Sequence, residues 1–138
     1  MTLRLAWYEW YPAYAYNFNG ISINAGDSIQ LTVNAYTTTT GLATIDNLTT
    51  GQSVSQHLSS SFALCEQDAE WIVEDYEEGG SLVPICDFGN IQFTDAYATT
   101  ANGTRIYPPN GIIVEIEQNG KVYTSVSAGS ESVYISYQ

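Results

Sequence analysis

Short runs rich in β-branched and aromatic residues recur about every 8 to 12 residues along this chain, with turn-forming residues between them. The clearest run, residues 28–36, alternates apolar Ile29, Leu31 and Val33 with polar side chains, as in a strand that buries one face. No stretch shows a convincing helical period. The pattern therefore predicts an all-β fold of antiparallel strands.

Four Asn-Gly dipeptides mark expected tight turns, because Asn and Gly tolerate the positive φ of two-residue hairpins. They lie at residues 19–20, 102–103, 110–111 and 119–120. Sheets with one buried face stack in pairs, so the expected architecture is a β-sandwich of two sheets. We expect strands near residues 3–11, 20–24, 28–36, 42–47, 52–58, 70–76, 81–86, 89–99, 112–118, 121–126 and 132–137.

The chain is short and strongly acidic. Its 138 residues are enough for one domain, and a formal charge of −12 argues against a nucleic-acid backbone or an anionic membrane as partner. Only three residues are Lys or Arg, so acid never gives the chain the large positive charge that unfolds ordinary proteins. The composition suits an acidic environment, although a charged surface kept for solubility is the plainer interpretation.

Export and membrane signals are weak. No run of about 18 apolar residues could span a membrane, and the first residues lack the features of a signal peptide. The sequons at Asn47 and Asn102 would permit glycosylation in a secretory compartment, but such triplets are common by chance.

Two segments place carboxylates among aromatic residues. In residues 70–76, alternation puts Glu74 on one face with Glu70, Ile72 and Tyr76, and the odd-numbered residues on the other. A carboxylate in such a strand-like run is either a solvent-facing charge or an acid-base catalyst.

In the N-terminal segment, Glu9 shares a face with Trp7 and Tyr11, while Tyr8 and Trp10 point the other way. The aromatic residues could equally serve packing.

Other catalytic arrangements lack support. His57 is the only histidine and stands near no recognisable nucleophile motif, so we interpret it as a strand-surface residue. One His and two Cys do not have the spacing of a zinc site, and no metal or cofactor is expected. Cys65 and Cys86 could pair with each other or both be free.

Four motifs together resemble the glutamic peptidases of the G1 (eqolisin) family, which are acid endopeptidases of mainly fungal origin. The resemblance runs collinearly over nearly the whole chain but lacks the family's N-terminal part. The motifs are AWYEWYP at residues 6–12, TTGQSVS at 49–55, CEQDAEWIVEDYEE at 65–78 and SLVPICDFG at 81–89.

The resemblance implies a concanavalin- or jelly-roll-like sandwich, incomplete at the N-terminus, with residues 1–138 as the C-terminal portion of the catalytic domain. It implies that Glu74 is the general base that activates water, and that Glu9, Trp7 and Tyr11 bind a peptide or protein substrate. An unperturbed glutamate titrates near pH 4.3, so such a base is matched to acid conditions. The resemblance also implies a secreted protein.

The family's catalytic glutamine and the disulfide partner of Cys65 both belong to the N-terminal part that is absent here. None of the seven glutamines falls in the matching motif. The chain could be a truncated gene product, a fragment that pairs with a separate N-terminal light chain, or an inactive homologue. The alternative functions are a non-catalytic module that binds a peptide or glycan, and a structural protein without a ligand.

Overall fold

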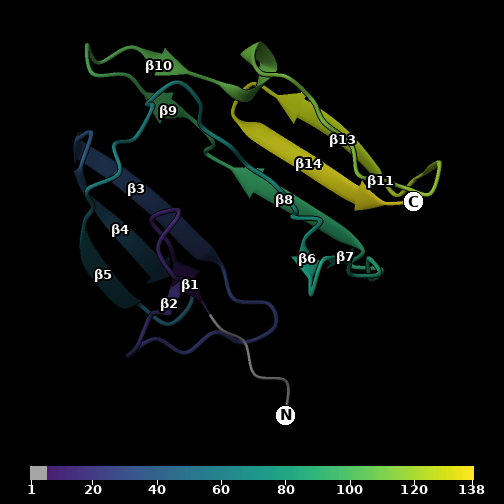
Figure 1. Cartoon of the computed structure of the whole chain (residues 1–138), viewed down its shortest axis with the longest axis horizontal. Helices are drawn as coiled ribbons and strands as arrows, with labels where there is room; N and C mark the ends of the chain where they lie inside the picture. Colours follow the sequence, from purple (N-terminus) through teal and green to yellow (C-terminus); the bar gives the residue numbers. More distant parts are fainter. Residues whose placement is uncertain (1–5) are drawn as a thin grey trace. The chain divides into compact units, whose positions relative to one another are not determined.

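The computed structural model describes residues 6–138, which contain β-strands, one short 3-10 turn and no α-helix (Figure 1). Every strand pair in this range is antiparallel, so the all-β prediction is confirmed. The chain divides into two compact units, one ending at Asp68 and the other beginning at Ala69. Each unit is described by itself, and the single-domain expectation stays a prediction.

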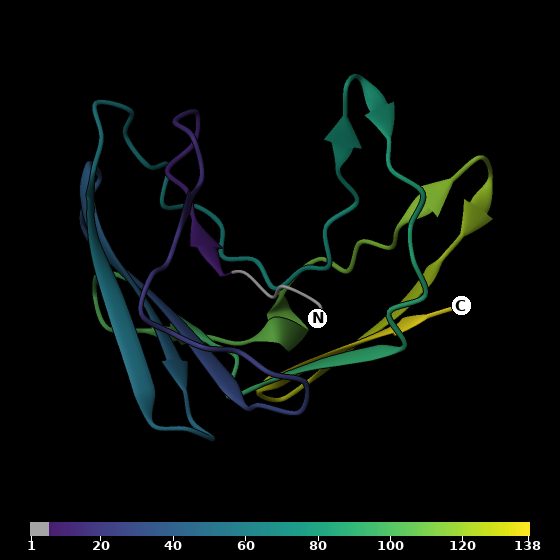
Figure 2. The ribbon, with the colours of Figure 1, turned by 90° about the horizontal axis from the view of Figure 1, so that it is seen from below.

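The first unit is built on a three-stranded meander, ordered β3-β4-β5, whose strands lie side by side in Figure 2. Its strands are β3 (Ile29–Thr37), β4 (Thr40–Asn47) and β5 (Gln52–Ser59). The central strand β4 buries Ala43 and Ile45, which form the apolar core of this unit.

A two-stranded ribbon accompanies the meander. It pairs β1 (Trp7–Tyr8) with β2 (Tyr16–Asn17), and the Tyr8 ring packs against Tyr16 and edge-on against Phe18. These ring contacts add apolar packing to a ribbon too short to be stable alone.

The second unit has one three-stranded sheet, ordered β13-β14-β8, and four smaller pairings. Val133 and Ile135 of β14 are buried in its core, together with Ala96. The elements are β6 (Glu77–Glu78), β7 (Ser81–Leu82), β8 (Asn90–Thr94), β9 (Ala98–Thr99), β10 (Arg105–Ile106), η1 (Pro108–Asn110), β11 (Glu117–Gln118), β12 (Lys121–Val122), β13 (Thr124–Gly129) and β14 (Ser132–Tyr137).

The predicted turns differ in outcome. Asn119 and Gly120 both have positive φ, 53° and 76°, in the hairpin between β11 and β12, as the sequence predicts. Gly111 instead has φ −88° at the end of η1, so the hairpin predicted at residues 110–111 is wrong. Pro108 begins that 3-10 turn, and the Gly111 N–H donates to its carbonyl (2.9 Å).

The predicted strands at 28–36, 42–47, 52–58 and 132–137 are close to β3, β4, β5 and β14. The expected strand at 3–11 is reduced to β1, with residues 1–5 outside the described residues. The run 89–99 divides into β8 and β9, with Asp95 at φ 52° between them.

Two predicted strands are wrong as hydrogen-bonded strands. Residues 20–24 and 70–76 belong to no ladder in the described part of the chain. A sequence can make a segment extended, but a ladder also needs a neighbouring backbone at the correct spacing. No described segment supplies that neighbour. Among residues 6–138, no helix is long and apolar enough to cross a membrane.

Candidate active site

Glu74 lies on an extended segment of the second unit that leads into β6. Trp71, Val73 and Asp75 of this segment are half-buried, whereas Ile72 and Glu74 are exposed. The side chains thus alternate as predicted, although the backbone has no strand partner. The carboxylate of Glu74 is presented on the exposed face, while the other face holds the segment to its unit.

Gln118 anchors this segment from beneath. Its amide Nε2 donates to Asp75 Oδ1 (2.8 Å) and to the Val83 carbonyl (3.1 Å), and the residue is buried. Charge-assisted hydrogen bonds such as that to a carboxylate are stronger than neutral ones. Gln118 therefore positions Asp75, the neighbour of Glu74, from a distance of 43 residues along the chain.

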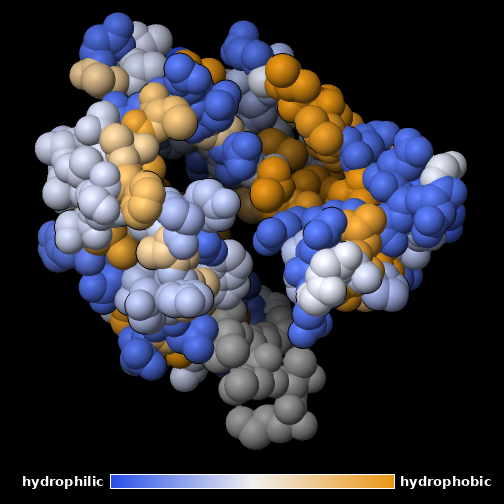
Figure 3. Space-filling model, viewed as in Figure 1, coloured by the Kyte–Doolittle hydropathy of each residue, from blue (hydrophilic) through white to orange (hydrophobic). Residues whose placement is uncertain are grey.

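The segment borders a hollow of about 430 Å³ within the second unit. Its floor is apolar and includes Val126 and Ala128 of β13 with Val133 and Ile135 of β14. Residues 69–75 and residues 111–116 line it as well. Figure 3 shows hydrophobic residues gathered over this part of the second unit.

Charged residues around the hollow have one sign. The lining includes Glu70, Glu74, Asp75 and Glu115, with no Lys, Arg or His among the described residues that form it. A positive or neutral group is therefore favoured there over an anion.

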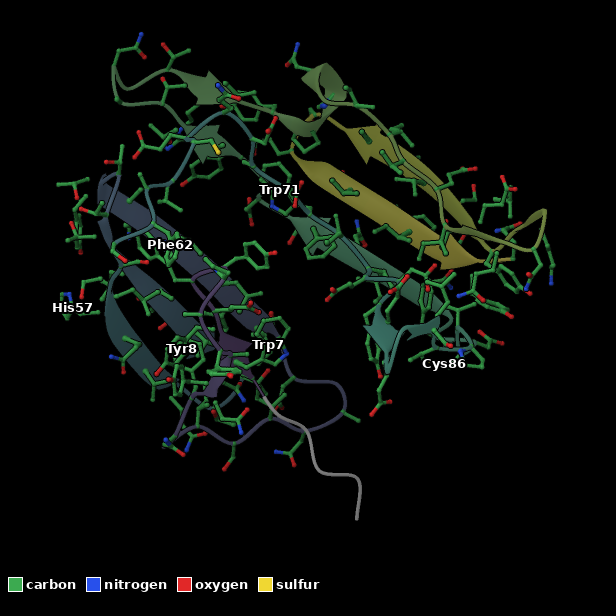
Figure 4. All side chains as sticks on the ribbon, in the orientation of Figure 1. Trp7, Tyr8, His57, Phe62, Trp71 and Cys86 are labelled. Atoms are coloured by element: carbon green, nitrogen blue, oxygen red, sulfur yellow. The ribbon has the colours of Figure 1, made fainter. Side chains whose placement is uncertain are left out.

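In the first unit, Trp7, Glu9 and Tyr11 are exposed, while Tyr8 and Trp10 are half-buried. This is the alternation that the sequence predicts. Figure 4 shows the side chains of Trp7 and Tyr8.

Trp10 fastens the segment, because its indole Nε1 donates to the Phe62 carbonyl (2.8 Å). Glu9 and Tyr11 border a hollow of about 170 Å³, which Val33, Leu42 and other residues of this unit complete. Tyr11 is 83% exposed, so its ring is free to contact a bound group.

The remaining candidates lie on the surface. His57 is exposed on β5, as predicted, and points away from the sheet in Figure 4. Cys65 and Cys86 are both exposed free thiols, so they do not pair with each other in this structure. Within residues 6–138, no cluster of three or more His, Cys, Asp or Glu side chains has a metal-binding arrangement.

The structure thus groups the predicted site residues by unit. Trp7, Glu9 and Tyr11 share one exposed face of the first unit, and Glu74 belongs to the second. Gln118 was missed by sequence reasoning, since nothing in the sequence signals a contact between residues 75 and 118. The roles of these residues in a reaction stay predictions.

Two exposed carboxylates among aromatic residues, on an all-β antiparallel scaffold, define an acidic binding protein or hydrolase. The Peptidase A4 family model matches residues 4–137, so the chain belongs to that family.

Named relatives agree. The chain is 50% identical over 134 residues to aspergillopepsin-2 of Aspergillus niger, covering 96% of this chain and 47% of that protein. It is 41% identical over 141 residues to scytalidopepsin B of Scytalidium lignicola, covering 96% of this chain and 54% of that protein. The chain therefore spans about half the length of the curated relatives that it matches.

Solved structures are also similar. The crystal structure of aspergilloglutamic peptidase from Aspergillus niger matches with a TM-score of 0.88 and 49% identity, over 96% of this chain and 78% of that one. Scytalido-glutamic peptidase with a transition state analog inhibitor matches with a TM-score of 0.83 and 38% identity, over 97% and 69%. These likenesses are consistent with the expected all-β sandwich.

Proposed function

We propose that this chain is the C-terminal portion of the catalytic domain of an acid-acting glutamic endopeptidase, with Glu74 as its general base. The observation that carries the proposal is the presentation of Glu74. Its carboxylate is exposed at an apolar hollow, on a segment whose opposite face is anchored, in a member of the Peptidase A4 family. A fixed carboxylate that remains open to water is what activation of a water molecule needs.

In the proposed reaction, the Glu74 carboxylate takes a proton from a water molecule as the water oxygen attacks the carbonyl carbon of the substrate peptide bond. The carbonyl oxygen becomes an oxyanion, which an amide N–H of a glutamine stabilises. An amide keeps its donor at any pH, so it can serve in acid conditions where a histidine would be permanently protonated. The proton then passes to the leaving amine.

The glutamine of this reaction comes from outside residues 1–138. Gln118, the glutamine nearest to the segment in hydrogen-bonding terms, already donates to Asp75 and the Val83 carbonyl. A separate N-terminal light chain would supply the missing residue. About half of each matched relative lies outside the region of similarity, which leaves ample chain for this role.

Glu9, Trp7 and Tyr11 are proposed to bind the peptide substrate. Their exposed face offers a carboxylate between two aromatic rings, and such rings contact apolar substrate side chains well. The proposed location is extracellular, in line with an acidic chain that carries only three Lys and Arg and with relatives from fungi.

The test is cleavage of a denatured protein at pH 3 to 4, near the reference value for glutamate. The purified chain is assayed alone and after mixing with the separately expressed part of aspergillopepsin-2 that this chain does not match. We expect turnover in the mixture, and a loss of about 10²- to 10⁴-fold in the Glu74→Ala variant, because general-base catalysis contributes on that scale.

Glu70→Ala is the matched control, since Glu70 is another exposed carboxylate that lines the same hollow. It should retain turnover and, like Glu74→Ala, an unchanged circular dichroism spectrum. Full turnover by the Glu74→Ala mixture would rule out the assignment.

A non-catalytic peptide- or glycan-binding module is the second candidate, favoured by the exposure of Trp7 and Tyr11. It predicts quenching of tryptophan fluorescence by an added peptide or oligosaccharide at acid pH, with no new cleavage products in the mixture.

A further inference from the structure

The hollow in the second unit has two walls of extended backbone with unused hydrogen-bonding groups. In the described part of the chain, the backbone of residues 69–75 makes no hydrogen bond to another backbone group, and neither does that of 112–115. Pairing begins only at the ends of these segments, where Tyr76 and Ile116 accept bonds from Val83 (3.1 Å) and Tyr123 (2.9 Å). Such edges are templates for another strand.

The side chains at the hollow are apolar and uncovered. Ile112 is 94% exposed and Val114 is 79% exposed, and both line the hollow with the β13–β14 floor. Exposed apolar residues beside an apolar floor are characteristic of a surface that another polypeptide covers. The alternating burial of residues 71–76 shows that this backbone already has the side-chain arrangement of a strand.

We propose that this hollow is the docking site for one extended strand of polypeptide from outside residues 1–138. The strand pairs through its backbone with residues 70–75 and turns alternate apolar side chains toward Val133 and Ile135. Because the lining carries Glu70, Glu74 and Glu115 and no described basic residue, the strand is neutral or basic.

The occupant is assigned from the length of the relatives. This chain covers 47% of aspergillopepsin-2, so that protein has a large unmatched portion that could contain such a strand. The inference deepens the proposed function, on which it rests only for the light chain as the source of the strand. The binding itself requires no catalysis.

The experiment uses the full chain and overlapping synthetic peptides of about 12 residues from the unmatched part of aspergillopepsin-2, with scrambled peptides as controls. Hydrogen exchange read by mass spectrometry at pH 7 follows residues 70–75 and 112–115, whose unpaired amides should exchange fast. We expect one peptide to slow exchange in 70–75 by about tenfold or more. The same spectra report any cleavage of the peptide.

Val114→Asp should abolish this protection without unfolding the chain, because Val114 is already 79% exposed and the new charge repels an apolar strand. Val33→Asp is the matched control, since Val33 is 80% exposed in the first unit and does not line this hollow. It should leave protection unchanged.

The proposal is overturned if no peptide protects residues 70–75, if Val33→Asp weakens protection as much as Val114→Asp, or if the protecting peptide is cleaved as a substrate. Protection without protein cleavage in the acid assay would support the strand site and contradict the proposed function. Glu74-dependent turnover by the chain alone, with no protecting peptide, would do the reverse.

Discussion

Asn47 carries a sequon, and its buried side chain determines whether that sequon can be used. Its Nδ2 donates to the Ser22 carbonyl (2.9 Å) and to Asp27 Oδ2 (2.8 Å), and the residue is 1% exposed. Its Oδ1 accepts from two backbone N–H groups at the β4–β5 turn. A glycan on Nδ2 would require this network to open and bury a bulky polar group.

Asn102 presents the opposite case. It is exposed, and its Oδ1 accepts from the Thr104 N–H (3.1 Å) at the turn between β9 and β10. We predict that a eukaryotic secretory host glycosylates Asn102 and leaves Asn47 unmodified. Intact mass before and after glycosidase treatment measures this: Asn102→Gln should remove the glycan mass. A mass loss in Asn47→Gln would contradict the prediction.

Gln118 acts at the scale of the element, because it ties the segment 70–76 to the β11–β12 hairpin. We predict that Gln118→Leu raises hydrogen exchange in that segment and lowers stability by about 1–3 kcal/mol, since it leaves the Val83 carbonyl and Asp75 without this donor. Urea unfolding and exchange measured by mass spectrometry check both effects. Gln92→Leu, at an exposed position on β8, should change neither.

Gly41 allows β3 and β4 to approach closely. A Cβ at this position would lie 2.8 Å from the Asn34 carbonyl oxygen and 3.7 Å from the Trp10 ring. We predict that Gly41→Ala destabilises the protein by about 1–3 kcal/mol, because backbone must move to relieve the contact. Chemical denaturation is the measurement, with exposed Ser53→Ala on β5 as control. A wild-type midpoint for Gly41→Ala would refute this account.

The molecule as a whole combines open apolar surface with an acidic composition. Leu31 and Val33 of the edge strand β3 are exposed, as are Ile112 and Val114. Net repulsion at −12 opposes association at neutral pH. The sequence pI is about 4.1, so the repulsion vanishes as the carboxylates take up protons near that pH.

We therefore predict that the isolated chain associates, most strongly near pH 4 and less at pH 7. Light scattering after size-exclusion chromatography at pH 3, 4 and 7 gives the mass at each pH. Adding the unmatched part of aspergillopepsin-2 should reduce association by covering the open edges. A monodisperse monomer at pH 4 would contradict the expectation of exposed sheet edges.

Much of the local structure could be predicted from sequence, because strand alternation is a property of neighbouring residues. The exposed faces of Glu9 and Glu74 and the long strands β3, β4 and β5 follow from period two alone. The hairpin at Asn119-Gly120 follows from two residues that accept positive φ.

Tertiary structure decided which extended runs became strands. Residues 70–76 and the β3–β5 meander read alike in sequence, yet only the meander has neighbouring backbone to bond. It also decided that Gln118 meets Asp75 and that Asn47 is buried. Such pairings depend on residues distant along the chain, so sequence by itself determined the faces, and only the folded units determined what each face meets.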